Sequence, residues 1–131
     1  MKMKISKQVI VVRKDLNMRK GKMVAQGAHA AMAAILNNAK GSREERIIYL
    51  EEGSAINDWL NGRFTKICVS VNSEEELVSI YQQAKDAGLI CALITDAGLT
   101  EFNNVSTKTC CAIGPNWSDE IDEITGKLSL L

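Results

Sequence analysis

The spacing of apolar residues along the chain predicts four β-strands. Residues 8–12 form a short, continuous and mostly β-branched run, which is typical of a strand buried on both faces. Apolar and polar side chains alternate over 64–71 and predict a second strand, and further strand-like runs occupy 89–95 and 109–113. Because proline cannot donate to a sheet ladder, we expect the last strand to stop at Gly114-Pro115.

Between the first two strands the pattern changes to one that favours helices. Residues 21–37 are rich in alanine and methionine and contain no proline, so we expect the longest helix there. Residues 43–52 predict a second, more polar helix, and 55–60 add a turn anchored by Trp59. The apolar side of the 43–52 helix would consist of Ile47, Ile48 and Leu50.

Two more helices have recognisable end signals. Ser73 and Glu76 have the spacing of a capping box, in which two side chains satisfy free backbone donors at the start of a helix. Gly88 is expected to end that helix. Ser118 is expected to cap the last helix, and Gly126 to end it.

The predicted elements follow one another in the order β-α-α-β-α-β-β-α, without a linker or an internal repeat. This order implies an α/β fold in which helices flank one four-stranded mixed sheet. We expect residues 1–131 to form a single domain. The longest irregular connection in the second half, 99–108, lies beside the sheet, where loops often carry function.

Charge adds a feature that the element pattern does not show. The chain has 131 residues and a formal net charge of zero, and its 46% hydrophobic content is that of a globular domain. Residues 1–40 hold nine Lys or Arg and one acid, Asp15, so this segment carries +8 and the remainder −8. Such asymmetry can mark a polyanion partner. The alternative is that the charges of the two halves simply pair on folding.

Several classes of function lack the residues that they need. No apolar run reaches the roughly 18–20 residues of a membrane span, so we expect no membrane partner and a cytoplasmic location. The chain has one histidine and no C-x-x-C pair, which disfavours a metal site. Neither a Walker loop nor a G-x-G-x-x-G fingerprint is present. We expect the cysteines, which lie in strand-like runs, to be buried free thiols: Cys68, Cys91, Cys110 and Cys111.

The longest predicted helix has one polar stripe on an otherwise apolar sequence. Lys22, Gln26 and His29 follow one another at spacings of four and three, which places them on the same face. The stripe is either the solvent face or a functional face, and the hydrogen-bonding character of its residues favours function. Arg19 and Lys20 lie at the N-terminus of this helix, where backbone N–H groups and the helix dipole favour an anion such as a phosphate.

A second candidate group follows the third predicted strand. Asp96 begins a turn with glycine two residues later, and Thr100 lies in the same segment. Two interpretations stay open: Asp96 caps its own turn, or it faces Lys22 across the sheet edge. In the second case a Lys–Asp pair with a threonine hydroxyl nearby could orient a water and stabilise developing charge.

Taken in order, these residues resemble the type II peptidyl-tRNA hydrolases, the archaeal and eukaryotic kind. The resemblance runs from Gln8 to Leu131, and the order and spacing of its pieces make it specific. The chain departs from the family pattern at Ser106, which stands in the place of a glycine shortly before the last strand. The matching segments are 8–13, 15–16, 20–22, 25–26, 29–30, 73–77, 96–101, 112–115, 124–126 and 127–131.

The resemblance implies an activity and a set of functional positions. Members hydrolyse the ester between a peptide and the terminal ribose of tRNA, recycling the tRNA. They use no metal or organic cofactor, and they are usually homodimers with a four-stranded mixed sheet and flanking helices. The expected partner is therefore tRNA carrying a peptide. The family's functional positions fall here on Lys20, Lys22, Gln26, His29, Asp96, Thr100 and Thr109.

We expect Lys22, Asp96 and Thr100 to be the catalytic residues. Asp96, oriented by Thr100, would position or deprotonate a water, while Lys22 stabilises the oxyanion or the departing ribose oxygen. Alternatively, the Thr100 hydroxyl is itself the nucleophile. The expected substrate-binding residues are Arg19, Lys20, Gln26, His29 and Thr109.

The runner-up function belongs to a different class. A noncatalytic domain with the same fold would bind RNA or a protein, and a third possibility is a purely structural domain. A binding module has no need for the Lys22, Asp96 and Thr100 set, which favours the enzyme.

Overall fold

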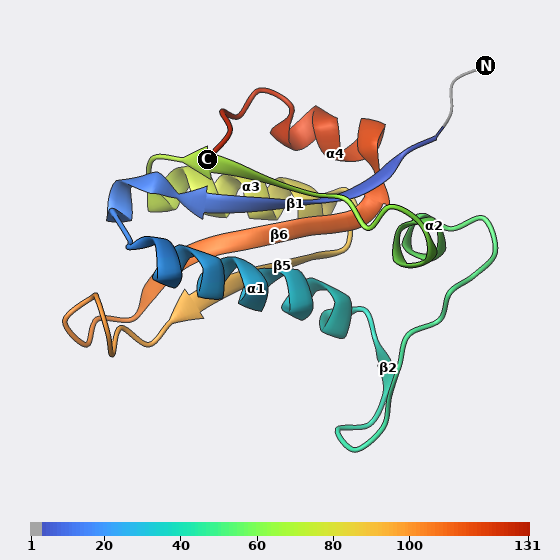
Figure 1. The fold of residues 1–131 in the computed structure, drawn as a ribbon, viewed down its shortest axis with the longest axis horizontal. Coiled ribbons are helices and arrows are strands. Elements are labelled where there is room, and N and C mark those ends of the chain that lie inside the picture. Colours follow the sequence, from blue (N-terminus) through green and yellow to red (C-terminus); the bar gives the residue numbers. More distant parts are fainter. Residues whose placement is uncertain (1–3) are drawn as a thin grey trace.

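A computed structural model describes residues 4–131 and contains one four-stranded mixed sheet in the strand order β4-β1-β6-β5 (Figure 1). β1 lies at the centre, parallel to β4 and antiparallel to β6, and β6 is antiparallel to β5. The predicted fold class is therefore confirmed. The four strands are β1 (Ser6–Arg13), β4 (Lys66–Val71), β5 (Cys91–Asp96) and β6 (Thr107–Trp117).

Helices cover both faces of this sheet. α1 (Lys20–Asn37) packs across β5 and β6, and α2 (Ala55–Asn61) packs beside it against β1 and β6. α3 (Glu74–Asp86) and α4 (Ser118–Thr125) cover the opposite face, and a short 3-10 turn (Lys14–Leu16) connects β1 to α1. The predicted element order is confirmed, with the helix between α1 and β4 lying at α2.

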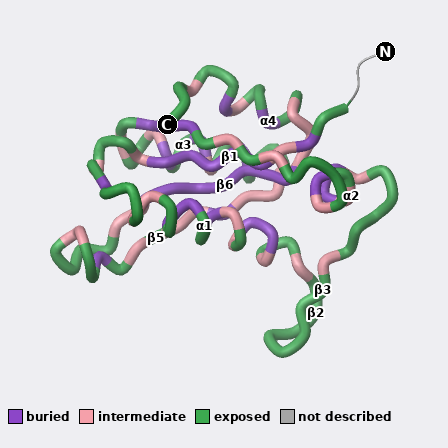
Figure 2. The backbone as a smooth tube through the Cα atoms, viewed as in Figure 1, coloured by how far each residue is buried: buried purple, intermediate pink, exposed green. Residues whose placement is uncertain are grey.

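The alternation of β1 side chains divides the core into two layers. Val9 and Val11 pack with α3 and α4, whereas Ile10 and Val12 face α1. All four are buried, as the continuous apolar run predicted, and Figure 2 shows burial concentrated along β1 and β6. The central strand thereby holds both helical layers in place.

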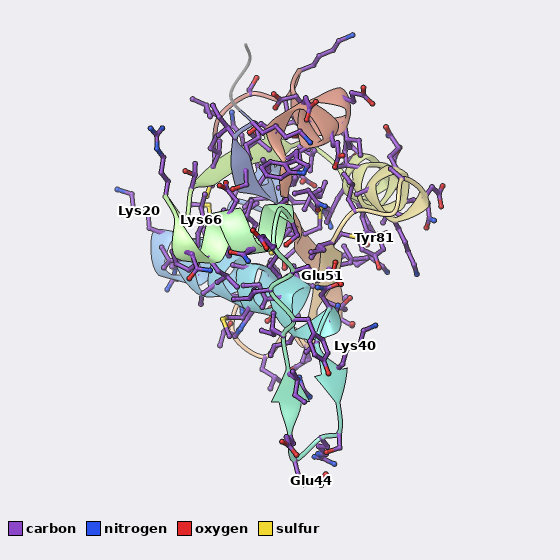
Figure 3. The ribbon with its side chains drawn as sticks, turned by 90° about the vertical axis from the view of Figure 1, so that its right-hand side faces the viewer. Lys20, Lys40, Glu44, Glu51, Lys66 and Tyr81 are labelled. Carbon is purple, nitrogen blue, oxygen red and sulfur yellow. The ribbon has the colours of Figure 1, made fainter. Side chains whose placement is uncertain are left out.

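The expected helix over 43–52 is wrong. A small hairpin of β2 (Lys40–Gly41) and β3 (Arg46–Ile47) occupies this region and projects from the body of the molecule, with Glu44 near its tip (Figure 3). Ile47 and Leu50 are 38% and 40% exposed, so the apolar side of a helix at 43–52 would have no core to pack against. Gly41 permits the hairpin because its φ is +99° and a Cβ there would lie 2.2 Å from the Glu45 carbonyl oxygen.

The helix that replaces it begins a few residues later and has a complete local explanation. Ser54 caps α2 by accepting a hydrogen bond from the Asn57 amide at 3.3 Å. Trp59 is fully buried, and its indole N–H donates to the Thr65 carbonyl at 2.8 Å. The predicted anchoring role of Trp59 is therefore confirmed.

Three local expectations are corrected in detail. β6 does not stop at Gly114-Pro115 but continues to Trp117, because the Gly114 amide donates to the Ile90 carbonyl and the chain passes a ladder irregularity there. Ser118 does not cap α4, since the N-cap is Trp117 and no side chain among residues 4–131 caps the helix. Ser73 does cap α3, but the Glu76 carboxylate accepts from the Asn72 amide rather than from Ser73.

The cysteines divide between the core and the surface. All four are free, but Cys68 is exposed and Cys91 half-buried, so the expectation of four buried thiols is wrong for these two. Cys110 and Cys111 are buried in β6, and burial raises the pKa of Cys110 to about 11 and that of Cys111 further. These two thiols therefore stay protonated at neutral pH.

The hairpin makes a testable prediction about Ile47. Because its side chain lies outside the core, Ile47→Ala should change the free energy of unfolding in urea by no more than about 0.5 kcal/mol. The matched variant Ile121→Ala removes a fully buried side chain and should cost about 2–5 kcal/mol. A comparable loss in both variants would show that residues 43–52 are packed against the core.

Candidate functional site

The first turn of α1 meets the end of β5 in a cluster of three polar side chains. The Lys22 ammonium donates to Asp96 Oδ1 at 3.0 Å and to Thr100 Oγ1 at 2.8 Å. Asp96 is the last residue of β5, and Thr100 lies in the loop that follows. The fold therefore joins residues that are more than 70 positions apart in the sequence.

Asp96 fills both of the roles left open by the sequence. Its Oδ2 accepts the Gly98 amide at 2.8 Å, so the side chain caps its own turn, while Oδ1 faces Lys22. Gly98 has a φ of +84° and lies so close to Val105 that a Cβ would come within 2.2 Å of the Val105 carbonyl oxygen. The tight turn and its glycine thus fix the direction of the carboxylate.

A buried glutamine connects this cluster to the sheet. Gln26 donates from Nε2 to Asp96 Oδ1 at 3.3 Å, and its Oε1 accepts the Thr109 hydroxyl at 2.5 Å. The backbone carbonyl of Gln26 also accepts the Cys110 thiol at 3.2 Å. Gln26 and Thr109 are both buried, so each polar atom needs the partner that it has.

Thr109 reaches Gln26 because the ladder between β5 and β6 is irregular at this point. Ile94 pairs with Cys110 and Thr95 pairs with Lys108, so Thr109 has no partner on β5. A bulge of this kind redirects a side chain next to a functional site. The bulge turns the hydroxyl of Thr109 toward α1 and thereby anchors the polar chain that ends at Lys22.

The surroundings keep Asp96 ionised. Its pKa is lowered chiefly by the hydrogen bond from Lys22, and the Gly98 amide and Gln26 add to the effect against the opposing cost of desolvation. The side chains of Lys22 and Asp96 are 14% and 15% exposed, so the pair is largely shielded but still reachable. A carboxylate with a lowered pKa is a weak base, and it is better suited to holding a water or a cation than to removing a proton.

The remaining predicted site residues lie outside the hydrogen-bond network that joins Lys22, Asp96, Gln26 and Thr109. Arg19 is the N-cap of α1, with its side chain 91% exposed and its Nε 3.8 Å from Glu101 Oε1. Lys20 is exposed at the start of the helix. His29 is exposed on the same flank of α1 as Lys22, two turns along, and it has no hydrogen bond to any residue within 4–131. The polar stripe predicted from spacing is therefore divided: Gln26 is buried and His29 faces solvent.

Two neighbours of the cluster had no assigned role in the sequence. The Lys22 ammonium lies 5.6 Å from the centroid of the Phe102 ring, and the Glu101 carboxylate accepts the Arg19 amide at 3.4 Å. Both residues follow Thr100 directly, so the loop after β5 closes over the start of α1. In the sequence, only the position of Glu101 and Phe102 in the predicted loop 99–108 indicated that they could lie near the site.

Features of two other classes of site are missing from the part of the chain that the structure describes. Within 4–131 no three His, Cys, Asp or Glu side chains lie close enough together to hold a metal ion. None of the helices in this range is both long and apolar enough to span a lipid bilayer.

Known proteins resemble this chain over nearly its whole length. The family model described as peptidyl-tRNA hydrolase PTH2 matches residues 6–131. A peptidyl-tRNA hydrolase of Methanocaldococcus jannaschii is 44% identical over 125 residues, which cover 95% of this chain and 99% of that protein. Peptidyl-tRNA hydrolases of Methanopyrus kandleri and Methanothermobacter thermautotrophicus are 42% and 44% identical, each over 95% of this chain and 97% and 99% of their own.

The tight turn after Asp96 can be tested with two glycine variants. Gly98→Ala and Gly53→Ala both place a Cβ at positive φ, which costs about 1–2 kcal/mol of stability, but only the Cβ at Gly98 collides with backbone. We expect Gly98→Ala to lower the free energy of unfolding in urea by more than Gly53→Ala does. The Asn104 amide donates to the Gly98 carbonyl, and its hydrogen exchange should become faster in Gly98→Ala. Equal costs and an unchanged Asn104 exchange rate would contradict the described turn.

Proposed function

The chain belongs to the peptidyl-tRNA hydrolase family PTH2, and on this premise we propose that Lys22, Asp96 and Thr100 form its catalytic centre. The reaction is hydrolysis of the ester between a peptide and the terminal ribose of tRNA, and it takes place in the cytoplasm, where tRNA is used. The observation that carries the proposal is the Lys22 ammonium held between Asp96 and Thr100. These three residues combine a fixed cation, a fixed carboxylate and a hydroxyl.

The hydrolysis follows from the placement of these groups. A water attacks the ester carbonyl carbon while Lys22 stabilises the negative charge that develops on the carbonyl oxygen. The bond from that carbon to the ribose oxygen then breaks, and the ribose oxygen takes up a proton from the water. The products are a peptide carboxylate, a tRNA with a free terminal hydroxyl and one proton released to solvent.

Asp96 positions the water and the lysine rather than acting as a strong base. Its Oδ1 accepts from Lys22 and Gln26, whereas Oδ2 has one lone pair free beyond the Gly98 amide and can hold the attacking water. Since its pKa is lowered, the carboxylate remains charged and keeps Lys22 in place. Orientation of this kind supplies much of the effect that a catalytic group can give.

Thr100 acts with the water and not as the nucleophile in this proposal. Its hydroxyl accepts a hydrogen bond from Lys22, which leaves its own proton free to be donated to the water or to a substrate oxygen. A hydroxyl that accepts from an ammonium is a poorer nucleophile, because the donor withdraws the electron pair that would attack. A water held between Thr100 and Asp96 avoids this difficulty.

Gln26 and Thr109 support the centre from behind. Thr109 has no exposed surface, and its hydroxyl donates a hydrogen bond to Gln26. Thr109 therefore acts by fixing the side chain of Gln26, which in turn donates to Asp96. His29, which is exposed on the Lys22 flank of α1, remains the substrate-contacting residue of the stripe.

Arg19 and Lys20 provide the contact to the tRNA backbone. Both lie at the N-terminus of α1, where no described side chain (residues 4–131) caps the helix, and there the helix dipole adds to their charge. Some of the positive charges of residues 1–40 form ion pairs within the fold, as Lys7 does with Asp122. Lys20 has no ion pair among residues 4–131, and a phosphate would compete with Glu101 for Arg19.

We also propose that the protein is a homodimer joined through an apolar groove beside α1. The groove, of about 640 Å³, runs between α1 and the side of β1 and β4 that faces α1, on the flank of α1 that faces away from Lys22. Val24 and Met32 on its rim are 73% and 55% exposed, which is unusual for large apolar side chains that lie together. Burial of this face between two copies would leave both catalytic centres open. Figure 3 shows Lys20 and Lys66, which border the groove, on one side of the molecule.

The catalytic centre is tested by hydrolysis of an N-acetylated aminoacyl-tRNA. Lys22→Ala should lower kcat about 100- to 1000-fold, because the transition state loses its principal electrostatic donor. Asp96→Asn should lower kcat strongly as well, since the amide cannot hold the lysine charge. Thr100→Ser should retain most of the activity, and Thr100→Ala should retain a measurable part of it if water is the nucleophile.

Controls separate these effects from general loss of charge. Lys40→Ala removes an exposed basic residue on the β2-β3 hairpin and should leave kcat and KM unchanged. Lys20→Ala should raise KM without lowering kcat, as expected for a phosphate contact. Wild-type rates for both Lys22→Ala and Asp96→Asn would refute the proposed centre, and complete inactivity of Thr100→Ala with active Thr100→Ser would make Thr100 the nucleophile.

The dimer is tested by light scattering on the purified protein. We expect the mass of a dimer for the wild type and of a monomer for Met32→Glu, because a buried unpaired charge opposes association. Val78→Glu introduces the same charge at an exposed apolar residue of α3, outside the groove, and should stay dimeric. A monomeric wild type, or a dimeric Met32→Glu variant, would contradict the proposed interface.

A further inference from the structure

The two edge strands of the main sheet, β4 and β5, differ in whether another segment pairs with their outer side. The edge at β4 is covered by the end of the chain, because the Ser70 amide donates to the Ser129 carbonyl at 2.9 Å and the Leu131 amide donates to the Cys68 carbonyl at 3.1 Å. Within residues 4–131 the outer side of β5 has no such partner, since β5 pairs only with β6. In Figure 1 β5 forms the edge of the sheet opposite β4.

The free edge of β5 also lacks the usual protection against pairing. Proteins commonly shield an open edge with lysine, proline or a bulge in the edge strand. β5 reads Cys-Ala-Leu-Ile-Thr-Asp, and its single charge, Asp96, is engaged by Lys22. The bulge next to it lies on β6 and not on the edge strand itself. A six-residue open edge of this kind is suited to receiving another extended segment.

The ladder shows which peptide groups face outward. The Ile90 carbonyl accepts the Gly114 amide at 2.7 Å, so the backbone of Ile90 is directed toward β6. In an antiparallel ladder this direction alternates from residue to residue. The N–H and C=O groups of Cys91 and Leu93 are therefore directed to the free edge, which ends beside the catalytic Asp96.

We propose that the peptide of the substrate binds as an added strand along the outer edge of β5, which extends the proposed function and rests on it. The scissile ester contains the C-terminal carbonyl of the peptide, and the catalytic centre lies at the C-terminal end of β5. The peptide therefore runs parallel to β5, with its N-terminus toward Cys91. At about 3.3 Å per residue, five or six peptide residues cover this edge.

Strand addition suits the chemistry of this substrate. Main-chain hydrogen bonds recognise any peptide, because they do not depend on its side chains. A hydrolase that acts on peptides of differing sequence needs this kind of recognition. The apolar groove on the other flank of α1 selects for apolar side chains and faces away from Lys22, so it is less suitable.

The two ends of the edge provide further room for the peptide. The α1 flank that carries Lys22 and His29 lies beside β5, since α1 packs across this strand. At the start of β5 a hollow of about 320 Å³ opens between α1 and α3, and Tyr81 and Leu89 contribute to its wall. Figure 3 places Tyr81 on the side of the molecule opposite Lys20 and Lys66, away from the proposed dimer groove. The peptide would thus pass His29 and end at this hollow.

The first test varies the substrate and leaves the protein unchanged. The wild-type enzyme is assayed on an N-acetylated aminoacyl-tRNA and on peptidyl-tRNAs that carry two to six residues, in two unrelated sequences. We expect kcat/KM to rise about tenfold or more with chain length, by a similar factor for both sequences, because each main-chain hydrogen bond contributes about 2- to 10-fold. N-methylation of single peptide amides should then reduce this gain at every second position only.

The second test removes one outward donor from the protein. Leu93→Pro deletes the amide that points to the free edge, a position at which proline is compatible with an edge strand. The ratio of kcat/KM on the longest to the shortest substrate should fall several-fold in this variant. Leu93→Ala retains the amide and is the matched control, so its ratio should stay near that of the wild type. If Leu93→Pro does not fold, the N-methylation series on the wild-type enzyme decides alone.

The outcomes separate this proposal from the proposed function. An enzyme that cleaves the shortest substrate but shows no chain-length gain, or a gain without alternation, would overturn strand addition and leave the catalytic centre intact. Absence of cleavage on every substrate would overturn the proposed function itself. A Leu93→Pro variant that is monomeric while keeping the wild-type ratio would show that the β5 edge binds a second copy of the chain, which also overturns the proposal.

Discussion

The hydrogen-bonded chain from Thr109 through Gln26 to Asp96 and Lys22 is the constraint on which the site depends. It starts in the core, where Thr109 and Gln26 are buried, and ends at a partly exposed ion pair. An unsatisfied polar atom in such a position costs about 1–3 kcal/mol, so each member has one favoured arrangement. The positions of Lys22, Gln26 and Asp96 are therefore set by the packing of α1 on the sheet, and the tight turn after β5 fixes the direction of the Asp96 carboxylate.

The fold was predictable where local sequence and burial agree. The run over 8–12 has one stable outcome, a strand covered on both faces, and Ser73 and Gly88 mark the ends of α3 by short-range chemistry. The hairpin at 40–47 was not predictable in the same way. Its apolar residues had no partner surface, and only the three-dimensional structure shows that the sheet is already covered by α1 and α2.

The candidate site was predictable in its members more than in its arrangement. Helical spacing placed Lys22 and Gln26 on one face, but it gave no reason to separate buried Gln26 from exposed His29. The role of Thr109 depends on a bulge in β6, which is a property of two paired strands and has no signature in either one alone. The two flanks of α1 consequently differ: one faces the cluster of Lys22, Asp96 and Thr100 and the free edge of β5, and the other faces an apolar groove.

The most direct test of this account is the pKa of the Asp96 carboxyl, measured by NMR through its carboxyl carbon. The hydrogen bonds from Lys22, Gly98 and Gln26 predict a value below the ordinary aspartate pKa of about 3.9, and Lys22→Ala should raise it. Thr109→Val, which frees Gln26, should also move it upward. An Asp96 pKa at the ordinary value in the wild type, unchanged in Lys22→Ala, would contradict the central claim that these residues form one fixed centre.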